Sequence, residues 1–159
     1  MGWWGTGILS GDMPLDRIWV FEKYAGIDRE SEDGGIFHPS RISEALATRL
    51  KALIEKDDMA WLNVTDENEY EHPVTVQVGA VIALAVGAKL SVDYKDKAIE
   101  IIQQDEWAKE DEERRVSINL LCHELMMSDG RKHIISSRGL MEMMVTGDKT
   151  LNETYLVKE

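Results

Sequence analysis

Apolar side chains recur at intervals of three and four residues in four stretches of the chain, a spacing that predicts amphipathic helices. The clearest helix opens at Pro39-Ser40 and continues through residue 55, and the others cover residues 15–24, 93–104 and 109–127. In chain order, the positions expected to be buried are Leu15, Ile18, Trp19 and Phe21; Ile42, Ala45, Leu46, Leu50, Leu53 and Ile54; Tyr94, Ala98, Ile101 and Ile102; and Val116, Leu120, Leu121, Leu125 and Met126.

The least polar segment of the chain runs from Val74 to Leu90. Valines at alternate positions near its start are typical of a strand, whereas its length and alanine content favour a buried helix that Pro73 begins. We therefore predict a central core helix. Gly79 and Gly87 would weaken this helix unless neighbouring parts of the protein pack close against them.

Shorter elements and loops separate the helices. Asp57-Asp58 is expected to begin a short element that carries Met59, Trp61 and Leu62. Residues 28–38 form a polar loop, which Ile36 and Phe37 are expected to anchor at its far end.

Residues 63–72 form an acidic loop. This loop lacks the alternating ligands and central glycine of a calcium-binding loop, so we interpret it as solvated surface. Near the C-terminus, residues 140–145 have helical character and residues 153–157 are candidates for a terminal strand. The pattern as a whole predicts a mainly α protein, a compact helical bundle in which residues 1–159 form one domain.

Residues 1–16 are unusual for a chain end because they contain four glycines and two tryptophans. Trp3 and Trp4 carry large apolar surfaces, so at least one of them should be buried or contact a partner. The glycines permit positive φ angles, which favours a compact irregular segment that is integral to the fold. Asp12 is expected to cap the following helix and Asp16 to stabilise its first turn; cation binding by this pair is the alternative.

The same opening carries a family resemblance. Met1-Gly2, Trp4-Gly5, Gly7-Ile8, Asp12 and Leu15-Asp16 resemble the start of domain-of-unknown-function family 4259, whose small bacterial and phage members open with Met-Gly-x-Trp-Gly-x-Gly. The resemblance covers about the first tenth of the chain, and Gly11 and Pro14 depart from the family pattern. It implies a small, mostly helical fold and supplies no activity, substrate or catalytic residue.

The formal net charge of −12, from 30 acidic and 18 basic residues, argues against direct binding to nucleic acid. It is compatible with a basic protein partner or with a surface that imitates nucleic acid. Solubility is the simpler interpretation of the same charge.

Cys122 is the only cysteine, which excludes an intramolecular disulfide, and its apolar helical neighbours predict a buried, inert thiol. No basic region followed by an apolar run opens the chain. The longest uncharged stretch, residues 74–88, is too short to span a bilayer core of roughly 30 Å. We therefore expect a cytoplasmic protein without membrane association.

His123-Glu124 invites comparison with the metalloprotease helix motif, which needs a second histidine four residues on, where this chain has Met127. A looser site would use His123, Asp129 and His133 as metal ligands, or His123, Glu124 and His133 as catalytic residues. A small metal-dependent hydrolase built on this region is the alternative function. Ordinary helix surface is the favoured interpretation, and no cofactor is expected.

The favoured function is a non-enzymatic, acidic interaction protein that binds a protein partner, with self-association left open. An inhibitor of a host defence enzyme, acting by charge mimicry, is the special case that the phage side of the resemblance implies. The Met cluster at residues 141–144 adds a potential contact surface. The residues predicted to bind are Trp3, Trp4, Gly5, Gly7, Asp12, Asp16, Glu67, Glu69 and Glu71.

Overall fold

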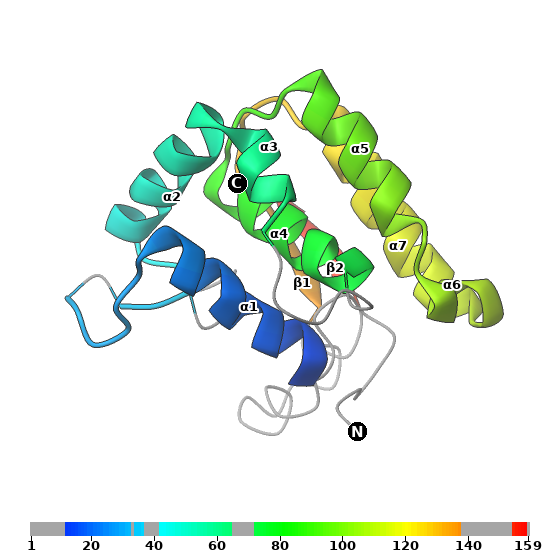
Figure 1. The fold of residues 1–159 in the computed structure, drawn as a ribbon. Coiled ribbons are helices and arrows are strands. Elements are labelled where there is room, and N and C mark those ends of the chain that lie inside the picture. The colour runs from blue at the N-terminus through cyan, green and yellow to red at the C-terminus, as the bar shows by residue number, and fades with distance from the viewer. Residues whose placement is uncertain (1–11, 33, 37–41, 65–71, 138–153, 159) are drawn as a thin grey trace.

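The structure is a computed structural model that describes residues 12–32, 34–36, 42–64, 72–137 and 154–158, with side chains described for residues 17–32, 34–36, 42–64 and 73–132. The predicted mainly α fold is confirmed (Figure 1). The helices are α1 (Asp12–Ala25), α2 (Glu44–Lys56), α3 (Asp58–Leu62), α4 (His72–Val86), α5 (Val92–Ile102), α6 (Glu106–Glu110) and α7 (Glu112–Met127), and the strands are β1 (His133–Ser137) and β2 (Thr154–Lys158).

Helix α4 is the centre of the fold, as predicted. It contacts α1, α2, α3, α5, α7 and β1, and Figure 1 shows it between α1 and α2 on one side and α5 and α7 on the other. Every residue from Thr75 to Ala88 is buried, which suits a helix that is apolar on all sides. The helix ends because Gly87 has a φ of 73°, and the amide of Ala88 then donates to the Ala83 carbonyl at 3.0 Å.

Gly79 allows α1 and α3 to approach α4 closely. This agrees with the expectation that neighbouring parts of the protein pack against the glycine. A Cβ atom at this position would lie 2.6 Å from Cζ of Phe21. The Trp61 ring packs against Phe21 with 4.6 Å between ring centroids, and its Nε1 donates to the Gly79 carbonyl at 2.9 Å. Phe21, Trp61 and Gly79 therefore form one tightly packed helix crossing.

The loop after α1 is held by a buried acidic residue. The Glu22 carboxylate accepts hydrogen bonds from the Arg29 guanidinium and, at 3.0 Å, from the Ile36 amide. Ile36 is buried, so its predicted anchoring role is confirmed, whereas Phe37 lies outside the described residues.

Two helix boundaries differ from the predictions. Helix α2 begins at Glu44 rather than at Pro39-Ser40, because Ser43 caps it and accepts from the Leu46 amide at 3.2 Å. The expected continuous helix over residues 109–127 is interrupted at Asp111, whose side chain caps α7 by accepting from the Arg114 amide at 3.0 Å. An internal cap outcompeted helix continuity at this point.

Four residues expected to face the core are exposed: Ala45, Trp19 at 59%, Val116 at 62% and Met126 at 62%. The prediction was wrong for α1 because Arg17 and Glu22 are buried there. It was wrong for α7 because Arg114 and Ser117 take core positions. Apolar spacing could not identify buried polar residues.

The C-terminal strand predicted over residues 153–157 is confirmed as β2. It pairs antiparallel with β1, with His133 opposite Lys158 and Ser137 opposite Thr154. Strand β1, which was not predicted, contacts α4. The predicted helix over residues 140–145 lies outside the described residues.

Candidate functional site

Most of the predicted binding residues lie where the structure gives no description. Trp3, Trp4, Gly5, Gly7, Glu67, Glu69, Glu71 and residues 141–144 are outside the described residues. Asp12 and Asp16 lie in α1, with their side chains outside the described set. Their roles in binding stay predictions.

The residues considered for a metal-dependent hydrolase lie in and after the last turns of α7. His123 is exposed, the adjacent Glu124 is buried, and Asp129 is exposed just beyond the helix. Successive helical side chains point about 100° apart, so His123 and Glu124 point in different directions. His133 begins β1, but its side chain is not described. Among the described side chains, no three His, Cys, Asp or Glu residues are placed to hold a metal ion.

Cys122 is buried in α7, as predicted. Burial raises the pKa of its thiol to about 11. The thiol is therefore protonated at neutral pH and is a poor nucleophile.

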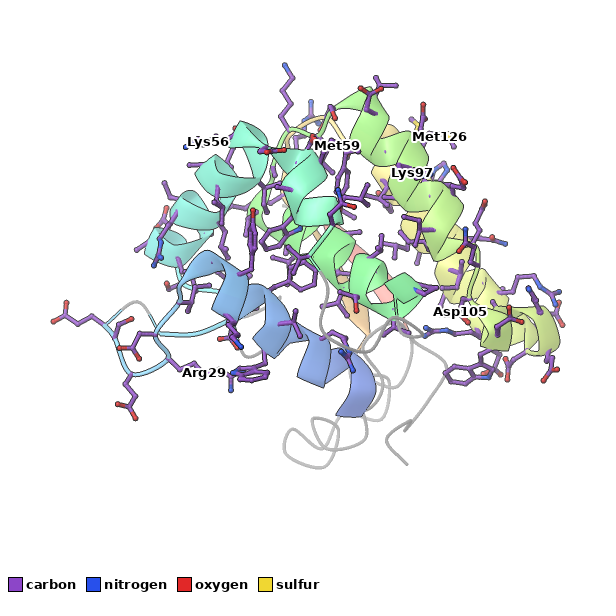
Figure 2. All side chains as sticks on the ribbon, viewed as in Figure 1. Arg29, Lys56, Met59, Lys97, Asp105 and Met126 are labelled. Carbon is purple, nitrogen blue, oxygen red and sulfur yellow. The ribbon has the colours of Figure 1, made fainter. Side chains whose placement is uncertain are left out.

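An open groove with a volume of about 490 Å³ lies between α3 and α5. Figure 2 shows Met59 on α3 and Lys97 on α5, the two helices that form its walls. Its lining residues are Met59, Leu62 and Asn63 on the α3 side and Asp93, Asp96, Lys97, Glu100 and Ile101 on the α5 side.

The floor of the groove is apolar and its α5 rim is charged. Leu62 and Ile101 are buried and Met59 is half-buried, whereas the four charged lining residues are exposed. These residues, Asp93, Asp96, Lys97 and Glu100, occupy positions i, i+3, i+4 and i+7 of α5 and therefore share one helix face. Lys97 Nζ lies 3.7 Å from Glu100 Oε2, which leaves a rim with a net negative charge.

The two walls of the groove are joined by hydrogen bonds between Asp58 and Ser91. The Asp58 carboxylate accepts from the Ser91 amide at 2.7 Å and from the Ser91 hydroxyl at 3.0 Å. The same hydroxyl caps α5 by accepting from the Tyr94 amide at 3.1 Å. Burial raises the pKa of Tyr94, and the negative charge of Asp58 raises it further. The start of α3 is thus fixed to the start of α5.

A second network fixes the far end of α5 to α4 and α7. Asp105 Oδ2 accepts hydrogen bonds at 2.9 Å from both Gln77 Nε2 and Arg114 Nη2, and Arg114 Nη2 also donates to Gln77 Oε1 at 2.9 Å. All three residues are buried, and the Arg114 guanidinium lies 4.9 Å from the centroid of the Trp107 ring. Asp105 also caps α6 by accepting from the Ala108 amide at 2.9 Å.

The pKa directions in this network agree with an ion pair. Burial alone would raise the pKa of Asp105, but hydrogen bonds from Gln77 and Arg114 and the guanidinium charge lower it overall. Burial lowers the pKa of Arg114, and the Asp105 charge opposes that change. Arg114 remains the cation because the ordinary pKa of a guanidinium lies far above neutrality.

The groove rim belongs to a strongly acidic part of the chain. Residues 93–113 contain nine acidic and three basic side chains, so half of the net charge of −12 lies in this stretch. The sequence predicts a helix over residues 93–104 with its apolar face inward, and it gives the charged residues of α5 no role. The apolar floor that makes this face a candidate site depends on α3, which no local pattern places beside α5.

Comparisons of the chain with protein-family models, with curated proteins and with solved structures found no match. The resemblance of residues 1–16 to family 4259 therefore stays a prediction. None of the helices in the described part of the chain is long and apolar enough to cross a membrane. Among the described features, an apolar groove with a carboxylate rim has the chemistry of a surface that binds a cationic, partly apolar ligand.

Proposed function

We propose that this protein is a non-enzymatic interaction protein that binds a basic segment of a partner protein in the groove between α3 and α5. The single observation that carries the proposal is the apolar floor of Met59, Leu62 and Ile101 beside a rim that contains three carboxylates. An apolar side chain of the partner would lose its hydration against the floor, and lysine or arginine side chains beside it would pair with the rim.

The two parts of the groove are expected to act on different steps of binding. Exposed carboxylates attract a basic partner over a distance that salt limits to about 8 Å at physiological ionic strength. They therefore act mainly on the association rate. Contacts on the apolar floor form only after docking, so they act mainly on dissociation.

We further propose that the protein binds this partner in the cytoplasm. In a special case, the partner is an enzyme whose basic surface normally contacts nucleic acid. The acidic rim would then occupy that surface and inhibit the enzyme by charge mimicry. The metal-dependent hydrolase remains the alternative prediction, since its residue His133 is not described beyond its backbone.

The test compares two variants that remove the same charge. The groove variant combines Asp93→Asn, Asp96→Asn and Glu100→Gln. The control variant combines Glu30→Gln, Glu32→Gln and Glu110→Gln, which are exposed residues that do not line the groove. The probe is a fluorescent peptide of lysine and leucine, and its binding is measured by fluorescence anisotropy.

We expect the groove variant to bind the peptide about tenfold more weakly, a loss of about 1.4 kcal/mol, and the control variant to bind within about twofold of the parent protein. Equal losses in the two variants would mean that the peptide responds to net charge and not to the groove. That result would refute the proposal.

A further inference from the structure

We infer that the segment bound in this groove is an amphipathic α-helix that carries basic side chains along one flank and apolar side chains on the face toward the floor. This inference rests on the proposed function and adds the conformation and the residue pattern of the ligand. It follows from the composition of the walls, from the spacing of the rim carboxylates and from the position of Lys97.

The walls exclude two common forms of peptide recognition. Addition of a strand needs an exposed sheet edge, and recognition of a polyproline helix needs a groove lined by aromatic side chains. The described lining of this groove comes from α3, from Asn63 just after it and from α5, and it contains no strand and no aromatic residue. Two helical walls with the Met59 side chain on the floor instead match the grooves that receive an amphipathic helix. The flexible methionine side chain can adapt to such a ligand.

The carboxylate spacing agrees with a helical ligand. At a rise of about 1.5 Å per residue, Asp96 lies about 4.5 Å beyond Asp93 along the α5 axis, and Glu100 lies about 6 Å beyond Asp96. A helix lying alongside α5 repeats these intervals with basic residues at positions i, i+3 and i+7. An extended strand presents side chains on one side every 6.6 Å or so, and a polyproline helix every 9.3 Å or so, so neither matches the first interval.

The length of the walls limits the ligand contact. Helix α5 contains 11 residues, which corresponds to a length of about 16 Å, or three turns. Packed helices lie about 8–10 Å apart, so a third helix placed over Leu62 and Ile101 would bring its basic flank to the α5 rim. The expected contact is therefore three turns of ligand helix.

Lys97 is expected to select among basic helices. It lies between Asp96 and Glu100 on the rim, and its pairing with Glu100 places a positive charge within an otherwise negative row. A ligand with a lysine opposite this position would meet a like charge, whereas a neutral or acidic residue there would not. Lys97 is therefore a specificity-determining residue for the proposed ligand.

The experiment uses two peptides of identical composition with the full-length protein. In the helical peptide, lysines occupy positions i, i+3 and i+7 and leucines occupy the adjoining face. In the alternating peptide, lysine and leucine alternate, which favours a strand. Binding is followed by anisotropy and the conformation of the bound peptide by circular dichroism.

We expect the helical peptide to bind at least tenfold more tightly than the alternating peptide and to gain helical signal when bound. We also expect Lys97→Gln to tighten binding about threefold for a helical peptide with an additional lysine opposite position 97. Met59→Gln, which alters the floor without changing charge, should weaken the helical peptide about threefold and provides a second test if the triple rim variant folds poorly.

The outcomes separate the inference from the proposed function. If both peptides bind equally and both depend on Asp93, Asp96 and Glu100, the helical ligand is refuted while the basic-segment groove stands. If neither the rim variant nor Met59→Gln changes binding of either peptide, the proposed function fails and the inference fails with it. Tight binding of the helical peptide that weakens about tenfold in the triple carboxylate variant and about threefold in Met59→Gln supports both.

Discussion

The packing of α1 and α3 against α4 can be tested by replacing one hydrogen atom with a methyl group. Gly79 is buried in α4, and a Cβ atom there would lie 2.6 Å from Cζ and 2.9 Å from Cε1 of Phe21 and 3.3 Å from Nε1 of Trp61. The Phe21 and Trp61 rings are themselves buried and in contact, so neither has free space into which it can move. Gly79→Ala is therefore expected to force α1 away from α4.

Two effects of Gly79→Ala oppose each other, and their sizes decide the sign. Alanine in place of glycine inside a helix stabilises it by up to about 1 kcal/mol. Overpacking of a well-filled core costs about 1–3 kcal/mol, and contacts below 3 Å on a ring that cannot move favour the upper part of this range. The expected net change is a loss of about 1–2 kcal/mol. For a chain of 159 residues, this loss lowers the melting temperature by about 2–8 °C.

The assay is thermal and urea unfolding of Gly79→Ala, of Phe21→Leu and of the double variant. Phe21→Leu removes the ring atoms that the new methyl group meets, so the double variant should be more stable than the sum of the two single changes predicts, by about 0.5–3 kcal/mol. A Gly79→Ala protein that melts above the parent protein would show that helix propensity prevails. In that case the close contact of Phe21 with α4 would be wrong.

Three further predictions concern the ion pair between Asp105 and Arg114 and the Cys122 thiol. Arg114→Met should cost about 3–5 kcal/mol of unfolding free energy in urea, because it leaves the Asp105 carboxylate buried without its cation; a loss below 1 kcal/mol would contradict the ion pair. The pKa of Asp105 is lower in the folded protein than its unfolded value of about 3.9. The ionised carboxylate therefore stabilises the folded protein fully above about pH 3.9, and this stabilisation is lost as the pH falls through the folded pKa. The difference in unfolding free energy between the parent protein and Asp105→Asn should shrink on acidification below about pH 4. Cys122 should react with a thiol reagent only at the rate of unfolding at neutral pH, since burial raises its pKa to about 11; labelling within seconds in the native protein would contradict this.

The sequence was sufficient to predict the apolar skeleton of the fold. Helix α5 follows from its apolar spacing, and the central helix α4 follows from the length and alanine content of its segment. The short helix α3 lies where Asp57-Asp58 was expected to begin an element. Helix starts were less predictable. The sequence predicts a start at Pro39-Ser40, whereas α2 begins at Glu44 after the cap Ser43, whose side chain accepts from the Leu46 amide.

The polar interior could not be predicted from the sequence. Gln77 is 28 residues from Asp105 in the sequence, and Asp105 is 9 residues from Arg114. No helical or strand periodicity relates side chains at these separations. Arg114 stands in a run of charged residues that is typical of solvent-exposed surface, yet it is fully buried. The groove has the same origin: its rim is local to α5, but its floor requires Met59 and Leu62 from a helix about 30 residues earlier.

The location of the charge, rather than its amount, favours a binding role for the acidic surface. Solubility depends on net charge and is served equally well by carboxylates spread over the whole molecule. Here residues 93–113 carry half of the net charge, and like charges this close repel one another and oppose folding of α5 and α6. The part-buried contact of Asp58 with Ser91 and the buried contact of Asp105 with Arg114 fix the start and the end of α5 in spite of that repulsion. Helix α5 is fixed at both ends, carries three carboxylates and Lys97 along one face, and lies beside an apolar floor. Repulsion between these carboxylates is unfavourable in the free protein, and a basic helix bound in the groove would relieve it.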